Sequence, residues 1–366
     1  MAKNSNLGAA KVAKYDEFYT RYADIQKEVN AYLEYNEDTF RDKVVLLPCD
    51  DPEWSNFTKF FAQNFELYGL KKLISTSYAV ESKKYKYYEP TLFETESPVF
   101  DADKTRTNGK IFILDRDTNR SGHIDLDDLQ FEYLEGDGDF RSLEVHKLRD
   151  EADIIVTNPP FSLFREFVSW IISADKSFLI IGNINALTYR EIFPLVKDNL
   201  VWLGQNTVKE FIQADGDLKK FGNISWFTNL EHGRRHQPLQ LMTMKDNLRY
   251  SRHIDLKESG YRKYYNYDAI DVPYVDAIPS DYEGVMGVPI SFLDKYCPDQ
   301  FEIIWRSHDL DWAENKCGFY KHTEKHIADR IKSVDKTWRA QIPYFLDSDG
   351  VHHNVYQRVF IRKIQK

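Results

Sequence analysis

The feature that most constrains this chain is an alternation of short apolar runs with segments whose apolar residues recur at helical spacing. An apolar run at 43–47 is followed by a segment, 55–70, with large apolar residues three or four positions apart, and then by a second run at 72–77. Buried strands that are joined by a helix run parallel, because the helix carries the chain back to the same end of the sheet. The pattern predicts an α/β protein.

The alternation resumes in the middle of the chain. It predicts a strand at 152–157, a helix at 163–173 and a strand at 177–182. Two later strand-like runs, 200–204 and 224–229, have no clearly periodic helix between them, so we expect them to pair antiparallel. The predicted fold is a mostly parallel sheet with helices on both faces and a final antiparallel hairpin.

Residues 80–135 interrupt this alternation. The segment is rich in Lys, Glu, Tyr and Asp, and it contains two strand-like runs, 110–114 and 124–131, around a polar turn. We interpret it as a hairpin inserted into the α/β domain.

The length of 366 residues suits two domains. The regular pattern loosens after residue 230 into basic and aromatic stretches, so we expect a first domain at 1–230 and a second region at 231–366. Hydrophobic residues make up 42% and aromatic residues 15% of the chain, a composition typical of folded globular proteins.

Targeting signals are not evident in the sequence. No apolar run approaches the roughly 18 residues of a membrane helix, and the N-terminus lacks the apolar centre of a signal peptide. We therefore expect a cytoplasmic protein with no membrane partner. Cys49, Cys297 and Cys317 lie far apart, which indicates reduced thiols and neither a disulfide framework nor a metal site.

The net charge of -9 argues against a simple basic nucleic-acid binder, since Lys and Arg contacts to phosphate dominate such affinity. The charge is unevenly distributed, however. Residues 81–150 hold 17 acids against 11 Lys and Arg, whereas residues 231–265 hold 8 Lys and Arg against 4 acids. An acidic body with a locally basic face is compatible with this pattern.

The strongest chemical signal is the tetrapeptide Asn158, Pro159, Pro160 and Phe161 at the end of the strand at 152–157. The Asn158 side-chain carbonyl and the Pro159 backbone carbonyl can each accept one N–H of a planar amine. The two prolines fix φ and stiffen the loop, which holds both acceptors in place. Phe161 can stack on a nucleobase, a contact worth about 1–3 kcal/mol.

This arrangement suits methylation of an exocyclic amine on a nucleobase. Such an amine is conjugated with its ring and becomes nucleophilic only when acceptors favour a pyramidal nitrogen. Because an enzyme cannot reach this atom inside a duplex, the base has to be flipped out of the stack. The alternative interpretation of the motif is a turn at the end of the strand in which the prolines have no catalytic role.

The sequence resembles the EcoRI-type adenine-specific DNA methyltransferases. The resemblance extends from about residue 15 to about residue 305. It is carried by the blocks 16–20, 49–52, 55–57, 136–142, 157–166, 178–183 and 284–290.

The resemblance implies a class I, Rossmann-like methyltransferase fold that binds S-adenosylmethionine. It makes 1–230 the catalytic domain, with the hairpin at 80–135, and 231–366 the DNA target-recognition region. The implied cofactor-binding residues are Phe18, Tyr19 and Thr20 near the methionine part, Asp50, Asp51 and Pro52 after the first strand, Ser77 at the end of the second, and Asp139 and Phe140 at the adenine.

The sequence departs from this fold at two points. The first turn, 48–52, lacks the usual glycines, and the second strand ends without an acid to bind the ribose. Ribose recognition therefore has no assigned residue. Asp50 and Asp51 have an alternative role as acids at a helix N-terminus, where the macrodipole favours them. Ligands of open α/β sheets bind beyond the carboxyl ends of the strands, where Asp50, Ser77, Asp139 and Asn158 would lie.

The segment 117–128 has oxygen-bearing residues at the spacing of a calcium loop, with Gly122 at the sixth position. Asp128 stands where such a loop usually has Glu, and the flanks predict strands where helices are required. We favour a polar hairpin turn and assign no metal.

Cations alternate with aromatics in the second region. Arg234, Arg235, Arg249, Arg252, Arg262 and Lys263 are candidates for DNA contact, for which the alternative is a solvated surface. A second basic stretch at 321–339 has the same two interpretations.

We expect methylation of adenine N6 at a specific site in double-stranded DNA. The alternatives are methylation of cytosine N4, RNA or protein glutamine, or a catalytically inactive DNA-binding protein of the same fold. A cognate restriction endonuclease acting on the same site without a stable complex is a further possible partner.

Overall fold

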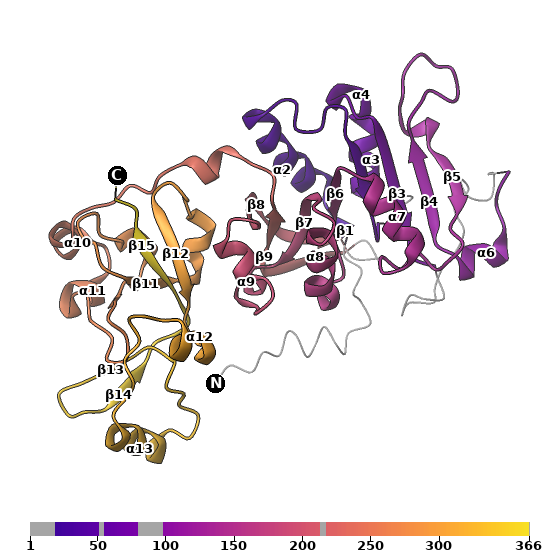
Figure 1. Cartoon of the computed structure of the whole chain (residues 1–366). Coiled ribbons are helices and arrows are strands. Elements are labelled where there is room, and N and C mark those ends of the chain that lie inside the picture. The colour runs from indigo at the N-terminus through magenta and orange to yellow at the C-terminus, as the bar shows by residue number, and fades with distance from the viewer. Residues whose placement is uncertain (1–18, 51–54, 80–97, 213–216, 366) are drawn as a thin grey trace. The chain divides into compact units, whose positions relative to one another are not determined.

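The structure, a computed structural model, describes residues 19–50, 55–79, 98–212 and 217–365. The chain divides into two compact units (Figure 1). Unit 1 comprises Met1–Ile192 and Leu200–Gly233, and unit 2 comprises Phe193–Asn199 and Arg234–Lys366.

Unit 1 is built on a mixed sheet, in which the described residues form nine strands in the order β1-β8-β9-β7-β6-β2-β3-β4-β5. The strands are β1 (Tyr19–Thr20), β2 (Val44–Leu47), β3 (Lys72–Ser77), β4 (Lys110–Leu114), β5 (Gln130–Tyr133), β6 (Ile154–Thr157), β7 (Ser177–Asn183), β8 (Trp202–Ile212) and β9 (Leu218–Thr228). The neighbours β7, β6, β2 and β3 run parallel, as the alternation of strands and helices predicted.

The expectation of a mostly parallel sheet has to be corrected, because antiparallel strands extend it on both sides. On one side β4 pairs antiparallel with β3, and β5 with β4. On the other side β9, β8 and β1 are each antiparallel to their neighbours. The antiparallel pairing of β8 with β9 confirms the predicted final hairpin. A two-residue strand such as β1 has no periodicity that a sequence could reveal.

Helices cover both faces of this sheet. On one face α2 (Tyr22–Tyr35) and α3 (Asn56–Gln63) pack into a core that contains Ile181 of β7. Gly182 points to the opposite face, since side chains alternate along a strand. There it leaves room for the Phe164 ring at the start of α8 (Phe164–Ile172), because a Cβ on Gly182 would lie 2.4 Å from that ring.

The remaining helical segments in the described part of unit 1 have three to nine residues. They are α4 (Phe65–Tyr68), α6 (Ala102–Thr107) and α7 (Leu143–Glu151), with the 3-10 turns η2 (Leu126–Asp128), η3 (Phe161–Leu163) and η4 (Ile184–Thr188). The single helix expected at 55–70 is therefore two helices. The break falls at Asn64, whose φ of -108° and ψ of 14° are not helical.

The inserted hairpin is present with one altered boundary. β4 and β5 pair antiparallel and extend the main sheet. The second strand was expected at 124–131 but begins at Gln130, because the preceding residues form η2 instead. The Asp125 side chain caps this turn by accepting the Asp127 N–H, which breaks the extended conformation there.

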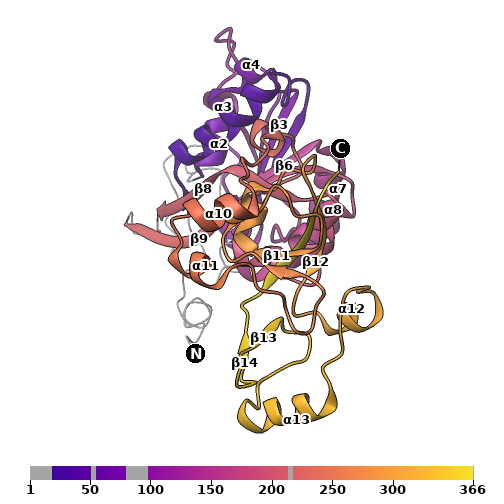
Figure 2. The same ribbon diagram turned by 90° about the vertical axis from the view of Figure 1, so that its left-hand side faces the viewer.

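Unit 2 has a smaller sheet of its own, which the described residues form in the order β10-β11-β15-β12, and a separate pair β13-β14 (Figure 2). Its strands are β10 (Ile270–Asp271), β11 (Met286–Pro289), β12 (Phe301–Arg306), β13 (Tyr344–Leu346), β14 (His352–Asn354) and β15 (Arg358–Lys363). Its helices are α9 (Phe193–Lys197), α10 (Met244–Tyr250), α11 (Ile254–Ser259), α12 (Leu310–Asn315) and α13 (Lys325–Val334), and the 3-10 turns η6 (Val275–Ala277) and η7 (Ile290–Lys295) lie between them.

The core of unit 2 is mainly aromatic and contains a buried ion pair. Tyr264, Trp312 and Phe360 belong to one buried cluster. At its border Arg358 Nε donates to Asp271 Oδ1 at 2.8 Å, and Tyr264 donates to the same oxygen. Much of the high aromatic content therefore serves packing. None of the helices in the described ranges is long and apolar enough to cross a membrane.

Candidate active site

The carboxyl ends of β2, β3 and β6 are joined by hydrogen bonds from side chains and loops. Thr157 Oγ1, at the end of β6, donates to the Pro48 carbonyl at 2.6 Å. The Asp50 N–H donates to the Thr76 carbonyl of β3 at 2.9 Å. The next strand in the chain, β3, lies beside β2 on one side, whereas β6 lies beside β2 on the other side. Open α/β sheets bind ligands where the strand order diverges in this way.

The turn after β2 contains an uncommon backbone conformation. Cys49 has φ of 63°, in the left-handed region that glycine adopts more readily. The turn that lacks the usual glycines thus forms with a cysteine in such a conformation. Asp50 follows with its side chain buried, whereas Asp51 and Pro52 lie outside the described residues.

Asn158, Pro159 and Pro160 leave β6 at this edge and lead into η3, which begins at Phe161. Asn158 is half-buried, and Pro159 is buried. The Pro160 carbonyl accepts the Leu163 N–H at 2.9 Å, which starts the 3-10 turn. No backbone N–H of the described residues donates to the Pro159 carbonyl. The rigid pair of acceptors is thus preceded by a buried strand and followed by a helical turn.

Phe161 connects this loop to the strand β8 of unit 1. Its ring is half-buried and meets the ring of Phe211 edge to face, with centroids 6.5 Å apart. Phe211 lies on β8 and pairs in register with Thr20 of β1. The sequence did not single out Phe211, whose place in the site follows only from strand pairing.

The N-terminal segment reaches the start of α3 through Thr20. Its carbonyl accepts a hydrogen bond from Asn56 Nδ2 at 2.8 Å, and Asn56 follows the capping residue Ser55. Thr20 is buried and Tyr19 is half-buried. Phe18, the third predicted residue of this segment, lies outside the described residues. Tyr19 and Thr20 thus lie beside the start of α3.

A tight loop after β5 closes against the end of β3. Gly138 has φ of 83°, and a Cβ placed on it would lie 2.2 Å from the Ser77 carbonyl oxygen. The Ala79 N–H donates to the Asp137 carbonyl at 2.8 Å. Only glycine allows this close approach. The glycine at position 138 therefore lets the loop that carries Asp139 lie against the buried Ser77.

The Asp139 carboxylate is held by a neighbouring guanidinium. Arg141 Nη2 donates to Asp139 Oδ2 at 2.6 Å and Arg141 Nε donates to Oδ1 at 2.9 Å. This pairing lowers the pKa of Asp139. Burial, with Cys49 and Asp139 nearby, raises the pKa of Tyr78, which is therefore a neutral phenol at neutral pH. Tyr78 and Arg141 were not among the predicted site residues, although both stand next to predicted residues.

Phe140 occupies a different environment from the one expected. It is 1% exposed, and its ring meets those of Phe167 and Trp170 of α8 at centroid distances of 5.0 and 5.6 Å. These contacts anchor the loop to the domain core. The expected packing of Phe140 on a cofactor ring stays a prediction.

Two of the six candidate DNA-binding cations of unit 2 are buried or partly buried. Arg235 is only 7% exposed and donates to Asn199 Oδ1 at 3.1 Å. Arg234 pairs with Asp294 and is partly buried. Charge patterning could not reveal this, because a buried and an exposed arginine look alike in a sequence. The guanidinium groups of Arg234 and Arg235 therefore have a structural role in unit 2.

The other four cations are exposed. Arg252 pairs with Asp276 at 3.0 Å, and Lys263 pairs with Asp268. The Arg262 guanidinium lies over the Phe345 ring, 3.9 Å from its centroid, and the Arg249 guanidinium lies 5.1 Å from the Tyr250 ring. Surface ion pairs are weak and exchange readily, so these cations remain accessible to a ligand.

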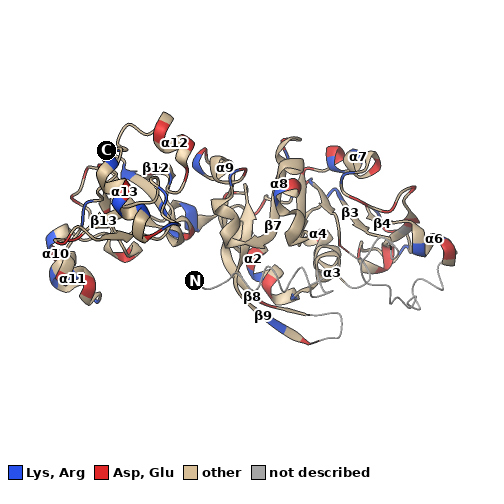
Figure 3. Ribbon diagram, turned by 90° about the horizontal axis from the view of Figure 1, so that it is seen from below, with Lys and Arg blue, Asp and Glu red and all other residues tan. Residues whose placement is uncertain are grey.

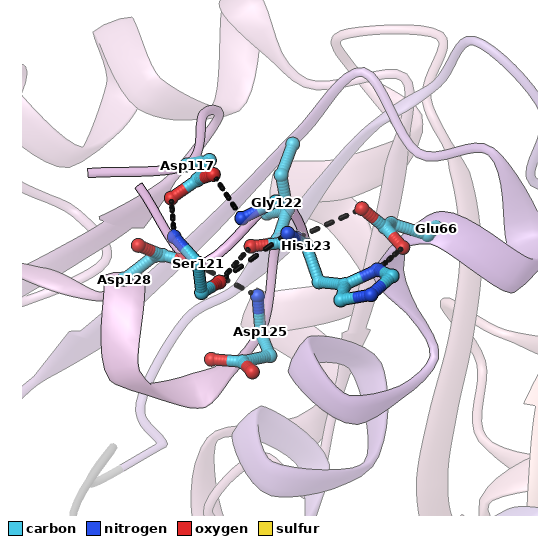
Figure 4. A network of polar contacts seen from close by, with 8 residues as sticks. Glu66, Asp117, Ser121, Gly122, His123, Asp125 and Asp128 are labelled. Atoms are coloured by element: carbon cyan, nitrogen blue, oxygen red, sulfur yellow. Dashed lines mark hydrogen bonds and ion pairs between the residues drawn. The ribbon is translucent and has the colours of Figure 1, made fainter. Parts of the chain in front are cut away.

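The loop at 117–128 satisfies its own carboxylates (Figure 4). Asp117 accepts the N–H groups of Ser121 and Gly122 at 3.1 and 2.8 Å. Asp128, which is 1% exposed, accepts the N–H of Thr118 at 2.7 Å. These bonds are those of a capped turn, as we favoured. Within the described ranges no group of three or more His, Cys, Asp or Glu side chains could hold a metal ion.

One cavity of unit 1, of about 570 Å³, lies away from this site. It is lined by Lys43, Asp153 and Ser177, which stand at the amino-terminal ends of β2, β6 and β7. Its position at the opposite edge of the sheet gives it no part in the chemistry considered for Asn158.

Comparison with known proteins identifies clear relatives. The family described as adenine-specific methyltransferase EcoRI matches residues 6–363. The type II methyltransferase M.EcoRI of Escherichia coli is 40% identical over 342 residues, which cover 87% of this chain and 96% of that protein. M.MpnI of Mycoplasma pneumoniae is 35% identical over 314 residues (81% and 83%), and M.MgeORF184P of Mycoplasma genitalium is 34% identical over 319 residues (82% and 85%). No solved structure gives a significant match.

Proposed function

Since the chain belongs to the family of EcoRI-type adenine-specific methyltransferases, we propose that it transfers a methyl group from S-adenosylmethionine to adenine N6 at a specific site in double-stranded DNA. The observation that carries this proposal is the placement of Asn158, Pro159, Pro160 and Phe161 directly after β6, at the edge where the strand order diverges.

The loop acts by holding the target amine. The Asn158 side-chain carbonyl and the Pro159 carbonyl each accept one N–H of adenine, which draws the nitrogen toward a pyramidal geometry and exposes its lone pair. The two prolines keep these acceptors in place without reorganisation, which is where much of the catalytic benefit arises. Phe161 stacks on the flipped base.

S-Adenosylmethionine, when bound, supplies an electrophilic methyl group on a sulfonium centre. Polar groups suited to its charged and hydroxyl-bearing parts come from the edge beside Asn158: Asp50 after β2, Ser77 at the end of β3, and Asp139 with its Arg141 partner. Thr20, next to Tyr19, is bonded through its carbonyl to Asn56 at the start of α3. We assign these residues, with Phe140 as packing support, to the cofactor site.

The four parallel strands β7-β6-β2-β3, with antiparallel β9 and β8 following β7, support a class I methyltransferase fold for unit 1. We assign target recognition to the region 231–366, and contacts to DNA to the exposed cations Arg249, Arg252, Arg262 and Lys263. Contacts from such cations to phosphate position a duplex, whereas contacts to the base edges specify the sequence.

Transfer of tritium from labelled cofactor to unmethylated genomic DNA, followed by nucleoside analysis, tests the reaction. Label is expected in N6-methyladenine. Asn158→Ala should lower the transfer rate by at least about 100-fold, because one of two pre-positioned acceptors is lost. DNA affinity should change little. Asn30→Ala, which removes an exposed amide on α2, serves as the matched control with unchanged rate.

Each alternative has its own outcome in this assay. Label in 4-methylcytosine, RNA or protein would assign a different planar nitrogen as the acceptor. DNA binding by the wild type without transfer to any DNA would identify a catalytically inactive binder.

The curated relatives are named type II methyltransferases. We propose the corresponding role here, protection of DNA against an endonuclease that cuts the same site. DNA from cells expressing the protein should resist one such nuclease, and sensitivity to all nucleases whose sites contain adenine would contradict this role.

A further inference from the structure

A small subdomain of unit 2, with a basic helix and a basic following loop, is not used by the function proposed above. It consists of α13 and the β13-β14 pair, which lie together in Figure 2. Ile331 of α13, Trp338 and Tyr344 of β13 form its buried core. Ile327 and Ala328 pack against this core, so one face of α13 points inward and the opposite face points to solvent.

The basic charge of this subdomain lies on α13 and the residues that flank it. Residues 321–339 hold six Lys and Arg against three acids, in a chain whose net charge is -9. All six cations are exposed, and Figure 3 shows basic residues along α13. They are Lys321, Lys325, Arg330, Lys332, Lys336 and Arg339.

These charges are poorly compensated within the protein. Lys321 has a distant ion pair with Asp268, at 3.9 Å. Lys325 and Lys336 form no ion pair with any described residue, although Glu324 and Asp335 are their sequence neighbours. Instead Glu324 faces His326, at 3.4 Å, and Asp335 accepts hydrogen bonds from Thr337. Like charges held together repel, and this cost is offset when a polyanion binds.

The subdomain is rigidly joined to the segment that carries two of the proposed DNA contacts. Asn266 Nδ2 donates to the carbonyls of Ala340 and Ile342 at 2.7 and 2.8 Å. Arg262 lies over the Phe345 ring of β13. Arg262 and Lys263 therefore belong to the same packed structure as α13.

We propose that the basic surface of α13 and the following loop binds the sugar-phosphate backbone of the DNA substrate, independently of base sequence. The inference rests on the proposed function and extends it to a second contact surface. The cations are distributed along a helix and its flanks and do not converge on one point. This distribution fits the repeated charges of a duplex better than a single small anion.

The test uses the salt dependence of binding to a short fluorescent duplex of arbitrary sequence. The double variant Lys325→Gln with Lys336→Gln should reduce the slope of log K against log salt by about 1.8, since each phosphate contact contributes about 0.9. Affinity should fall several-fold, to the same extent for every duplex sequence. The matched control, Lys71→Gln with Lys147→Gln, removes two exposed lysines of unit 1 and should leave the slope unchanged.

Two further measurements make the result decisive. Lys325→Arg with Lys336→Arg should retain the wild-type slope, because charge is conserved, and unchanged thermal unfolding of all variants shows that the fold is intact. An unchanged slope in the Gln variant overturns the proposal and points to a different partner, such as an acidic protein. Methyl transfer by the wild type to genomic DNA is measured separately, so failure of the catalytic proposal is distinguishable from failure of this one.

Discussion

Single residues hold the candidate site together through close backbone approaches. Gly138 lets the loop before Asp139 lie against the Ser77 carbonyl, and Cys49 turns the chain after β2 in a left-handed conformation. Left-handed backbone costs an L-residue about 1–2 kcal/mol. Strained positions of this kind persist where the surrounding structure over-determines them, as functional sites commonly do.

Gly138→Ala should lower the free energy of unfolding by more than about 2 kcal/mol, because the new Cβ overlaps the Ser77 carbonyl oxygen and the backbone has positive φ. Urea denaturation measures the effect. Gly122→Ala has a similar φ, of 89°, but an open environment, so it should show the backbone cost alone, about 1 kcal/mol. Equal losses in the two variants would contradict the close approach at Ser77.

Among the secondary-structure elements, β8 depends on a contact from α2. The pairing of β8 with β9 shifts register between Leu203 and Thr207. The buried Glu28 carboxylate of α2 accepts the N–H groups of Gln205 and Asn206, both at 2.7 Å. These donors would otherwise be unsatisfied in the interior. The contact therefore holds the strand that carries Phe211 beside the loop that contains Phe161.

Glu28→Ala should lower the free energy of unfolding by about 3 kcal/mol or more, since two buried N–H groups lose their acceptor. Glu34→Ala, an exposed acid on the same helix, should change it by less than about 0.5 kcal/mol. Chemical denaturation monitored by tryptophan fluorescence measures both. A small loss for Glu28→Ala would show that the register of β8 does not depend on this carboxylate.

The loss of stability caused by Glu28→Ala should depend on pH. Burial raises the pKa of Glu28, so the folded state keeps the proton at a pH at which the unfolded chain releases it. The stability contributed by this group is therefore highest at low pH and decreases as pH rises above the ordinary pKa of a glutamate. The penalty of Glu28→Ala should therefore shrink as the pH rises above the ordinary pKa of a glutamate. A penalty that grows over this range would contradict the raised pKa.

At the scale of the whole molecule, the division into units does not follow a single cut in the sequence. The chain enters unit 2 for Phe193–Asn199, returns to unit 1, and enters unit 2 again at Arg234. The expectation of a boundary near residue 230 does not include this excursion. Phe193, which begins α9, is buried and meets the ring of Trp305 with centroids 5.4 Å apart. A short segment from the middle of the chain thus contributes to the core of a unit built mainly from the last part of the chain.

Phe193→Ala should destabilise unit 2 by about 3–5 kcal/mol, because a large buried ring is replaced by a cavity. Hydrogen exchange resolved by residue is the suitable measurement. Protection should fall in β12 and β15 and persist in β2 and β6. Leu200→Ala, at a position 48% exposed, should leave both sets unchanged. Equal loss of protection in both units would show that they unfold together.

The sequence by itself determined the central strands and the motif that ends one of them. The strands β2, β3, β6 and β7 begin within two residues of their predicted starts, because strands buried on both faces appear as continuous apolar runs. The Asn-Pro-Pro-Phe tetrapeptide could be assigned a chemical role because a proline pair restricts the backbone locally, whatever surrounds it.

The tertiary structure alone decided features that depend on distant partners. The strand β1 exists only through its pairing with β8, and the burial of Arg235 and Phe140 follows from Asn199 and from the aromatic rings of α8. Phe211 joins the site because β8 passes Phe161. Local periodicity indicates which side of an element is buried, but it does not indicate which other element covers that side. The candidate site is formed by such contacts between elements.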